Sequence, residues 1–274
     1  MRRIVILAAL GWSIAGSAFG QQNIDTPAFS IHPAIDVPLI AAAAAWDVYG
    51  FSQISKKAPS NQAEVLALKT SDIDWLDRWA VHPYSKRADQ LSYVPFYVAM
   101  PLPLIVFAID KKMRKDYWRL SLLYGEAMTL TGVLYTSAVH YVNRHRPLVY
   151  ESASPLGTRL SPNSRNSFFA GHVALVGTSA FFIAGAYAAE HPESKAKWAF
   201  YGGAEAITAL TAYLRNRAGE HFFTDITLGN LVGAASGLLV PLLHQHMNKN
   251  AQHINILPFT TTHGTGLTML YHFG

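Results

Sequence analysis

Long apolar segments constrain this chain more strongly than any other feature of its sequence. Leu91–Ile109 holds nineteen consecutive residues without a charged side chain. Four more apolar segments follow it along the chain: Leu120–Val142, Val173–Ala189, Trp198–Leu214 and Ile226–Leu243. A helix needs about 20 predominantly apolar residues to cross a bilayer. The sequence therefore predicts an all-α protein, a bundle of about five to six apolar helices embedded in a membrane.

Composition favours a membrane protein over a nucleic-acid-binding one. Half of the residues are hydrophobic and 14% are charged, whereas about 25% of the residues in a soluble domain are charged. The formal net charge of +5 comes from basic residues scattered between the apolar segments. They do not form the continuous basic surface that binds nucleic acid. The chain contains no cysteine, which excludes disulfide bonds and thiolate metal sites.

The first residues have the pattern of a secretory signal. Arg2 and Arg3 precede the apolar run Ile4–Ile14, and small residues follow at Ala18 and Gly20. This order of basic, apolar and small residues is typical of a cleaved signal peptide. We therefore predict a signal peptide over the first 20 residues, with cleavage after Gly20.

Residues 21–89 are predicted to form an N-terminal leader with short helices at the membrane surface. Val37–Trp46 is apolar, but ten helical residues span about 15 Å, half of a hydrocarbon core that is about 30 Å thick. We therefore expect this segment not to cross. An amphipathic stretch around Trp75 and Trp79 is expected to lie on the bilayer or to cap a site.

The C-terminal tail, residues 247–274, has strand character. Apolar and polar side chains alternate between Leu267 and Phe273, after a turn signal at His263–Gly266. This pattern predicts a small β-hairpin from about Ile254 to Phe273.

Two histidines close to this tail raise the question of a metal site. His244 and His246 follow the last apolar segment. A protein metal site needs more ligands than two imidazoles. We therefore interpret the pair as a solvated helix end, and we expect no metal and no other cofactor.

Three polar patches at the ends of apolar segments carry the residue types that phosphoryl transfer needs. The patches are Asn143-Arg144-His145-Arg146-Pro147, Ser167-Phe168-Phe169-Ala170-Gly171-His172, and the residues from Arg215 to Asp225. A phosphoryl transition state spreads its charge over the equatorial oxygens, so positioned cations and N–H donors stabilise it. Arg146 and Arg215 can each bind two of these oxygens. Gly171 has no Cβ, so its backbone N–H can approach a phosphate closely.

The histidines in these patches can supply a nucleophile and an acid. His221 and Asp225 are four residues apart, which on a helix places them on one face, one turn from each other. A carboxylate bonded to one imidazole nitrogen fixes the tautomer and makes the other nitrogen a better nucleophile. His172 opens an apolar helix and can protonate the leaving oxygen as general acid. The pattern predicts an enzyme that binds an oxyanion with arginines and attacks it with a histidine.

At these positions the chain resembles the type 2 phosphatidic acid phosphatase / vanadium haloperoxidase superfamily, in particular its membrane phosphatase branch. The superfamily pattern is a lysine, six residues and Arg-Pro, then Pro-Ser-Gly-His, then Ser-Arg, five residues, His, three residues and Asp. The matching residues are Arg146, Pro147, Gly171, His172, Arg215, His221 and Asp225. The resemblance covers about residues 90–245, within a helical bundle that we predict over residues 90–246.

The resemblance implies a role for each matching residue. It makes His221 the nucleophile that forms a phosphohistidine, Asp225 its orienting partner and His172 the general acid. It also implies that the phosphate is bound by Arg146, Arg215 and the backbone N–H of Gly171.

The chain departs from the superfamily pattern at several positions. Val139 occupies the lysine position, Phe169-Ala170 the Pro-Ser position and Leu214 the position of the serine before Arg215. A charge-assisted hydrogen bond contributes about 1.5–3 kcal/mol, so these losses are expected to slow turnover. The residues that could replace the missing charge are His140, Arg144 and Arg217. The nucleophile and the acid are present, so we still predict an active enzyme.

The location of the patches predicts the topology. All three fall on the same side of the bundle, and the loop at 110–119, which has five basic residues, falls on the opposite side. Short basic loops stay in the cytoplasm. We therefore expect five crossings from Leu91 to Leu243, with the active site facing the periplasm.

The sequence favours a metal-independent phosphatase whose partners are the membrane and a lipid phosphate or lipid pyrophosphate substrate. Three other functions remain open. A soluble periplasmic acid phosphatase of the same superfamily would suit the signal peptide and the acidic residues Glu126 and Glu205 inside apolar segments. A non-catalytic lipid-binding protein would suit the missing lysine and serines. Vanadate-dependent halide oxidation would use the same oxyanion pocket.

Overall fold

The computed structural model describes residues 27–251, 254–261 and 264–271. The predicted signal peptide lies outside these residues. The α-helices are α1 (Pro33–Ser55), α2 (Gln62–Ala67), α3 (Lys86–Ala99), α4 (Leu102–Ile109), α5 (Tyr117–Tyr141), α6 (Leu156–Leu160), α7 (Gly171–Glu190), α8 (Lys197–Arg217) and α9 (Phe223–Ala251). Short 3-10 helices are η1 (Thr70–Asp72), η2 (Arg78–Ala80), η3 (Met113–Asp116), η4 (Pro147–Val149) and η5 (Pro162–Arg165).

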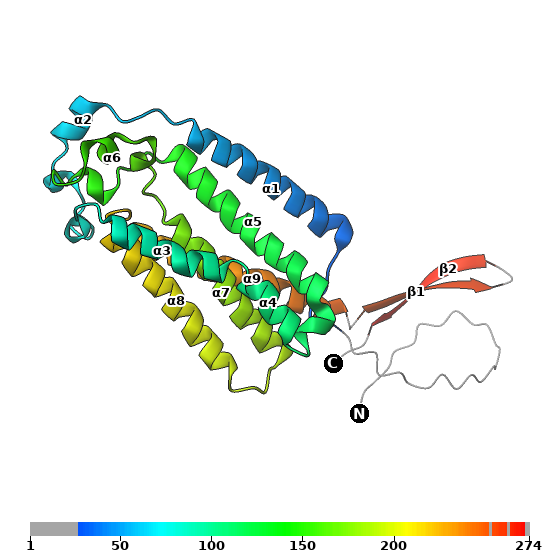
Figure 1. Ribbon diagram of the computed structural model, residues 1–274. Coiled ribbons are helices and arrows are strands. Elements are labelled where there is room, and N and C mark those ends of the chain that lie inside the picture. Colours follow the sequence, from blue (N-terminus) through cyan, green and yellow to red (C-terminus); the bar gives the residue numbers. More distant parts are fainter. Residues whose placement is uncertain (1–26, 252–253, 262–263, 272–274) are drawn as a thin grey trace. The chain divides into compact units, whose positions relative to one another are not determined.

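The chain divides into two compact units, and Ile31–Leu242 forms the larger one. This unit is a helical bundle in which α1 lies along α5, α5 packs on α7, and α8 packs on both α7 and α3 (Figure 1). The prediction of an all-α bundle is confirmed. The second unit comprises the residues before Ile31 and after Leu242. In it, β1 (Ile254–Thr261) and β2 (Gly264–Tyr271) pair antiparallel.

Glycines on α9 bring its backbone against α7. A Cβ added at Gly229, Gly233 or Gly237 would lie only 2.4–2.6 Å from a backbone carbonyl oxygen of α7 or of the residue that caps it. These glycines are spaced four residues apart, so they form one stripe along the helix. Small residues of this kind allow two helices to approach closely where lipid removes the hydrophobic driving force. The glycine stripe of α9 therefore forms the α7–α9 contact.

Prolines interrupt the apolar segment Leu91–Ile109. The helix stops after α3 and restarts as α4, with Pro101 at the new N-cap. Proline lacks an N–H and clashes with the carbonyl four residues earlier, which breaks the helical hydrogen bonding. The Tyr124 hydroxyl on α5 donates a hydrogen bond of 2.9 Å to the carbonyl oxygen of Met100. A neighbouring helix thus satisfies the group that the break exposes.

Helix α1 is longer than the ten residues predicted for Val37–Trp46. It runs for 23 residues, or about 35 Å at 1.5 Å per residue. Its C-terminal half contains polar residues, which end the apolar run in the sequence. In the structure these residues face α5. Trp46 donates a hydrogen bond of 3.0 Å to Ser137, and Asp47 packs against Gly132. Elsewhere the helix exposes large apolar side chains: Ile35, Val37, Leu39, Val48, Tyr49 and Phe51.

Among the residues that the structure describes, four helical segments are long and apolar enough to cross a membrane. They are α1, α3 with α4, α7, and the Phe223–Gln245 part of α9. The prediction that the segment around Val37–Trp46 is too short to cross was therefore wrong. Helix α1 ends at the same end of the bundle as the three motifs (Figure 1), so a crossing α1 places Pro33 at the opposite end. Pro33 and the motifs then lie on opposite sides of the membrane, contrary to the five-crossing topology.

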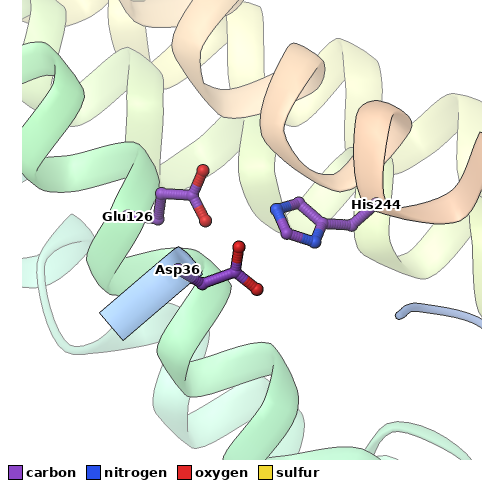
Figure 2. A group of neighbouring side chains, drawn as sticks. All are labelled: Asp36, Glu126 and His244. Atoms are coloured by element: carbon purple, nitrogen blue, oxygen red, sulfur yellow. The ribbon is translucent and has the colours of Figure 1, made fainter. Parts of the chain in front are cut away.

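Two acidic side chains lie next to each other where α1 meets α5. Figure 2 shows Asp36 of α1 and Glu126 of α5, whose carboxylate oxygens lie within 4.8 Å of one another. Asp36 also accepts a hydrogen bond of 2.7 Å from the backbone N–H of His32, which stabilises the start of α1. His244, also labelled in Figure 2, belongs to the second unit. There its Nδ1 lies 2.7 Å from the carbonyl oxygen of Ser30, so His244 is a hydrogen-bonded residue rather than a solvated helix end.

Cysteine labelling tests whether α1 crosses, because the chain has no cysteine of its own. We expect His32→Cys and Lys112→Cys to react with an impermeant maleimide on one side of sealed membranes. Ser55→Cys should react on the other side. All three positions are exposed, so their side chains can be replaced without disturbing the core. Labelling of His32→Cys and Ser55→Cys on the same side would show that α1 does not cross.

Candidate active site

The three motifs gather at one end of the helical bundle. The first follows the end of α5, the second leads into α7, and the third joins α8 to α9. Helices α2 and α6 lie at the same end (Figure 1). The motifs therefore meet on one side of the bundle, as their order along the chain predicts.

A glycine turn directs the third motif toward the first. Gly219 follows the end of α8 with a φ of +74°, the left-handed conformation that glycine adopts without strain at a helix C-terminus. A Cβ at this position would lie 2.9 Å from the carbonyl oxygen of His82. The carbonyl of Gly219 accepts a hydrogen bond of 2.9 Å from the N–H of Leu148. This bond attaches the turn to the loop that carries Arg146.

Arg146 and Arg215 lie in one buried charge cluster, 5% and 2% exposed. The Oε2 atom of Glu220 accepts a hydrogen bond of 2.9 Å from Arg215 and forms an ion pair with Arg146. Asp89 of α3 pairs with Arg215 at 2.7 Å, and the Asn163 side chain accepts a hydrogen bond of 3.0 Å from Arg146. The carboxylates offset the cost of burying two guanidinium groups, which would be large for unpaired charges.

Each of these two arginines keeps one donor available. The Nε atoms of Arg146 and Arg215 are buried and have no hydrogen-bond partner among the described residues. Burial and the positive charge of Arg215 lower the pKa of Arg146 to about 10, so its guanidinium stays charged at neutral pH. Leaving a buried donor unpaired is unfavourable, and an anion would form charge-assisted hydrogen bonds with both Nε–H groups. The cluster is therefore suited to binding an oxyanion.

His221 is buried beside this cluster, and its hydrogen bond fixes its tautomer. Its Nδ1 lies 2.7 Å from the carbonyl oxygen of Ser167. A carbonyl can only accept, so Nδ1 carries the proton and Nε2 has a free lone pair. Burial, followed by the positive charges of Arg215 and Arg146, holds the pKa of His221 well below its usual value. The imidazole is therefore neutral and can act as a nucleophile through Nε2.

Asp225 reaches His221 through Ser167 rather than by the direct contact that the sequence predicts. The spacing of four residues assumes that both lie on one helix, but α9 begins at Phe223 and His221 precedes it. The Asp225 carboxylate accepts hydrogen bonds from the Ser167 hydroxyl at 2.5 Å and from the N–H of Phe222 at 3.0 Å. Ser167 thus links the carboxylate to the histidine, with its hydroxyl on Asp225 and its carbonyl on His221.

Arg144 stabilises this arrangement through its contact with Asp225. It forms ion pairs with Asp225 and with Asp77 at 2.6 Å, and its guanidinium lies 4.6 Å from the centre of the Phe222 ring. Asp77 also accepts hydrogen bonds from the backbone N–H and the hydroxyl of Thr224, at 2.9 and 2.6 Å. The segment before α3 is therefore attached to the start of α9 through buried charges.

The other two auxiliary candidates lie elsewhere in the structure. Arg217 is exposed, and its charge helps to lower the pKa of His82, after burial of that imidazole. The His140 ring packs edge-on against Tyr141 with ring centres 4.7 Å apart. Of the three residues predicted to replace the missing lysine, the described contacts bring Arg144 alone to the candidate site, and it binds carboxylates there.

His172 lies in the first turn of α7, between aromatic side chains of α3. Its ring centre lies 4.9 Å from that of Tyr93 and 4.8 Å from that of Phe96. The neighbouring Gly171 has a packing role that the sequence did not indicate, since a Cβ there would lie 2.5 Å from the ring of Tyr135. The first N–H groups of a helix have no intrahelical acceptor, so those at the start of α7 remain suited to binding an anion.

Several residues of this site were missed by the sequence reasoning. Glu220 adjoins His221 in the chain, and its charge beside a nucleophile was a signal that could have been used. Ser167 lies inside the second patch, but its hydrogen bonds to Asp225 and His221 follow from the path of the loop. Asp77 and Asp89 lie in the segments before and within α3, far from the motifs in sequence, so their contacts depend on the tertiary fold.

A comparison with protein families identifies the domain that carries this site. Residues 120–249 match the family model described as the PAP2 superfamily. The matched region contains Arg146, His172, Arg215, His221 and Asp225. The segment that carries this site belongs to the PAP2 superfamily. The part of the chain before residue 120, with Asp77 and Asp89, lies outside the matched region.

Two solved structures resemble this chain. The crystal structure of Aquifex aeolicus LpxE is 24% identical in sequence, covers 63% of this chain and 98% of its own, and has a TM-score of 0.43. A transmembrane PAP2 type phosphatidylglycerolphosphate phosphatase from Bacillus subtilis is 20% identical, covers 76% of this chain and 96% of its own, and has a TM-score of 0.41. No curated protein gives a significant match to this chain.

The substitution Glu220→Gln tests the buried charge cluster. Removing one partner of a buried ion pair costs roughly 3–5 kcal/mol, so we expect a clearly lower melting temperature. Added inorganic phosphate should raise the melting temperature of the variant more than that of the wild type, because it replaces the lost negative charge. The matched control is Glu193→Gln, at an exposed position, which should melt like the wild type. Unchanged melting of Glu220→Gln would contradict the bridging role.

Proposed function

We propose that this protein is a membrane-bound phosphatase that hydrolyses the phosphate or pyrophosphate monoester of a lipid through a phosphohistidine on His221. The observation that carries the proposal is the pairing of a neutral His221, whose Nδ1 is bound to Ser167, with two buried arginines that each have an unpartnered Nε–H donor. A nucleophile beside an anion-binding pair is the arrangement that phosphoryl transfer requires.

The proposed reaction has two steps. In the first, Nε2 of His221 attacks the phosphorus, the bond to the lipid oxygen breaks, and His172 gives its proton to that oxygen. In the second, His172 takes a proton from water, the water oxygen attacks the phosphohistidine, and the P–N bond breaks to release phosphate. Arg146, Arg215 and the N–H of Gly171 bind the phosphoryl oxygens in both steps. The scheme uses no metal ion.

An apolar cavity beside the site supports a lipid substrate. The cavity has a volume of about 340 Å³ and lies between α3, α4, α7 and α8. Its lining is apolar and includes Ala99, Ile183, Gly203 and Ile207. Ala99 is three residues along α3 from Phe96, the ring that packs on His172. The cavity can therefore hold part of a hydrocarbon chain whose head group is at the histidines.

The same observations favour the membrane enzyme over a soluble acid phosphatase. Within the described part of the chain, four helical segments are long and apolar enough to cross a bilayer, and α1 exposes several large apolar side chains. The basic residues at 110–119 lie at the end opposite to the site, which favours a periplasmic active site. With α1 crossing, the chain before Pro33 would then be cytoplasmic. The proposed periplasmic orientation of the active site therefore rests on the basic loop at 110–119 and not on a cleaved signal peptide.

Phosphate release from purified protein in detergent tests the proposed activity. We expect hydrolysis of a lipid phosphate by the wild type and none by His221→Ala, because the nucleophile is lost. His172→Ala should retain some activity, with a loss of about 10²–10⁴-fold, the usual contribution of general acid catalysis. Rapid quenching with labelled substrate should trap phosphate on His221, and a chelator should not inhibit. Hydrolysis by His221→Ala at the wild-type rate would disprove the proposed nucleophile.

Neighbouring glycines on α8 provide a test of the hydrocarbon chain. A Cβ at Gly202 or Gly203 meets no atom within 4 Å, but Gly203 lines the cavity. Gly203→Leu should lower kcat/KM for a long-chain lipid phosphate by about 10-fold or more, since losing the burial of even two CH₂ groups costs about 1.6 kcal/mol. Activity on a short phosphate ester should not change. Gly202→Leu is the control and should leave both activities unchanged, and equal effects on both substrates would contradict the assignment.

A further inference from the structure

Lys57 approaches the first motif from outside the matched PAP2 region. It lies two residues after the end of α1, in the loop that leads away from that helix (Figure 1). Its ammonium group lies 2.6 Å from the carbonyl oxygen of Val139, 2.9 Å from the Asn166 side-chain oxygen and 3.4 Å from that of Asn143. The three donors of a lysine ammonium are thus directed to three acceptors on two segments of the chain.

These two segments carry the residues of the candidate site. The N–H of Arg146 donates to the carbonyl of Ser164 at 2.8 Å, and the N–H of Ser167 donates to the carbonyl of Arg144 at 3.1 Å. The pairing sets the backbone positions of Arg146 and of Ser167, which holds His221. Lys57 joins the two segments at Asn143 and Asn166, next to this pairing.

Side-chain amides continue the contact from Lys57 to the guanidinium of Arg146. The Asn166 oxygen accepts from Lys57, so its amide nitrogen faces the other way and donates to the Asn163 oxygen at 3.1 Å. The same Asn163 oxygen accepts from Arg146 at 3.0 Å. Because the ammonium can only donate, it fixes the orientation of the Asn166 amide. It thereby determines which atom of Asn166 is presented to Asn163.

We propose that Lys57 is a positioning residue for the phosphate site, one that orients Arg146 through Asn166 and Asn163. It acts at Val139, the position where the superfamily pattern has a lysine, but binds the backbone carbonyl there. The side chain of Val139 is itself fully buried. The inference rests on the proposed function in one respect, that the anion bound by Arg146 is the substrate phosphate.

Binding of orthovanadate, a phosphate analogue, to the full-length protein in detergent tests this role without requiring turnover. Lys57→Met should raise the Kd for vanadate and the KM for a short phosphate ester by about 10-fold, the lower limit for losing one charge-assisted hydrogen bond. The value of kcat should change much less, because His221 and His172 are untouched. Lys57→Arg should restore most of the affinity. The control Lys56→Met, at an exposed position, should bind vanadate like the wild type.

The relay is tested by combining Lys57→Met with Asn166→Ala. Residues in one network show non-additive effects, so the double variant should bind vanadate about as weakly as the weaker single variant. Fully additive losses would overturn the relay. Wild-type affinity in Lys57→Met would overturn the positioning role even if its melting temperature falls.

A second variant tests the same role if Lys57→Met does not fold. Asn143→Ala, at an exposed position, removes one acceptor of the Lys57 ammonium and should weaken vanadate binding to a smaller degree. Wild-type affinity in Asn143→Ala would also count against the positioning role.

The two proposals can fail separately. Vanadate binding that depends on Lys57, in a protein that does not hydrolyse lipid phosphates, would leave the positioning role intact and reject the proposed function. Hydrolysis with vanadate binding that is independent of Lys57 would do the reverse. A wild type that binds no vanadate would overturn both.

Discussion

The burial of two guanidinium groups at one end of a helical bundle is the constraint on which the rest of this structure depends. Arg146 and Arg215 repel each other and are costly to remove from water. One carboxylate oxygen of Glu220 pairs with both guanidinium groups, and the carboxylate of Asp89 pairs with Arg215. These contacts offset the free-energy cost of burying the two charges. These partners occupy terminal nitrogens of the guanidinium groups and leave the Nε–H groups unpaired. The same contacts that stabilise the cluster thus determine which donors can receive an anion.

A second charge cluster keeps His221, the proposed nucleophile, in place. Arg144 lies between Asp77 and Asp225, and Asp225 in turn holds the Ser167 hydroxyl. His221 therefore depends on a carboxylate that it does not touch, through a serine that presents its carbonyl to the imidazole. The two clusters draw on elements from different parts of the chain. The N-terminal segments supply Asp77 and Asp89, whereas the matched PAP2 region supplies Glu220 and Asp225 together with the arginines and histidines.

The sequence predicted the residues of the site better than their contacts. Arg146, His172, Arg215 and His221 could be found because their types and spacings follow from the chemistry, and the alternation of helices brings them to one end. The contact between His221 and Asp225 was mispredicted because it assumed a helix that starts at Phe223, two residues too late to include His221. The length of α1 was mispredicted because its polar residues, such as Asp47, break the apolar pattern that identifies a span. The contacts of Lys57 and Asp77 depend on tertiary structure, which local periodicity does not encode.

The distance between the proposed acid and the proposed nucleophile is set by helix packing rather than by the motifs themselves. His172 begins α7, and His221 directly precedes α9. The N–H of Ala170 donates to the carbonyl of Asp225 at 3.1 Å, which joins the starts of the two helices. Below this bond, Gly229 and Gly233 bring the α9 backbone into close contact with the residues at the start of α7. A larger side chain at either glycine would push the helices apart and separate the histidines, although neither glycine contacts them. The glycine stripe that allows this bundle to pack in a membrane therefore also sets the geometry of the reaction.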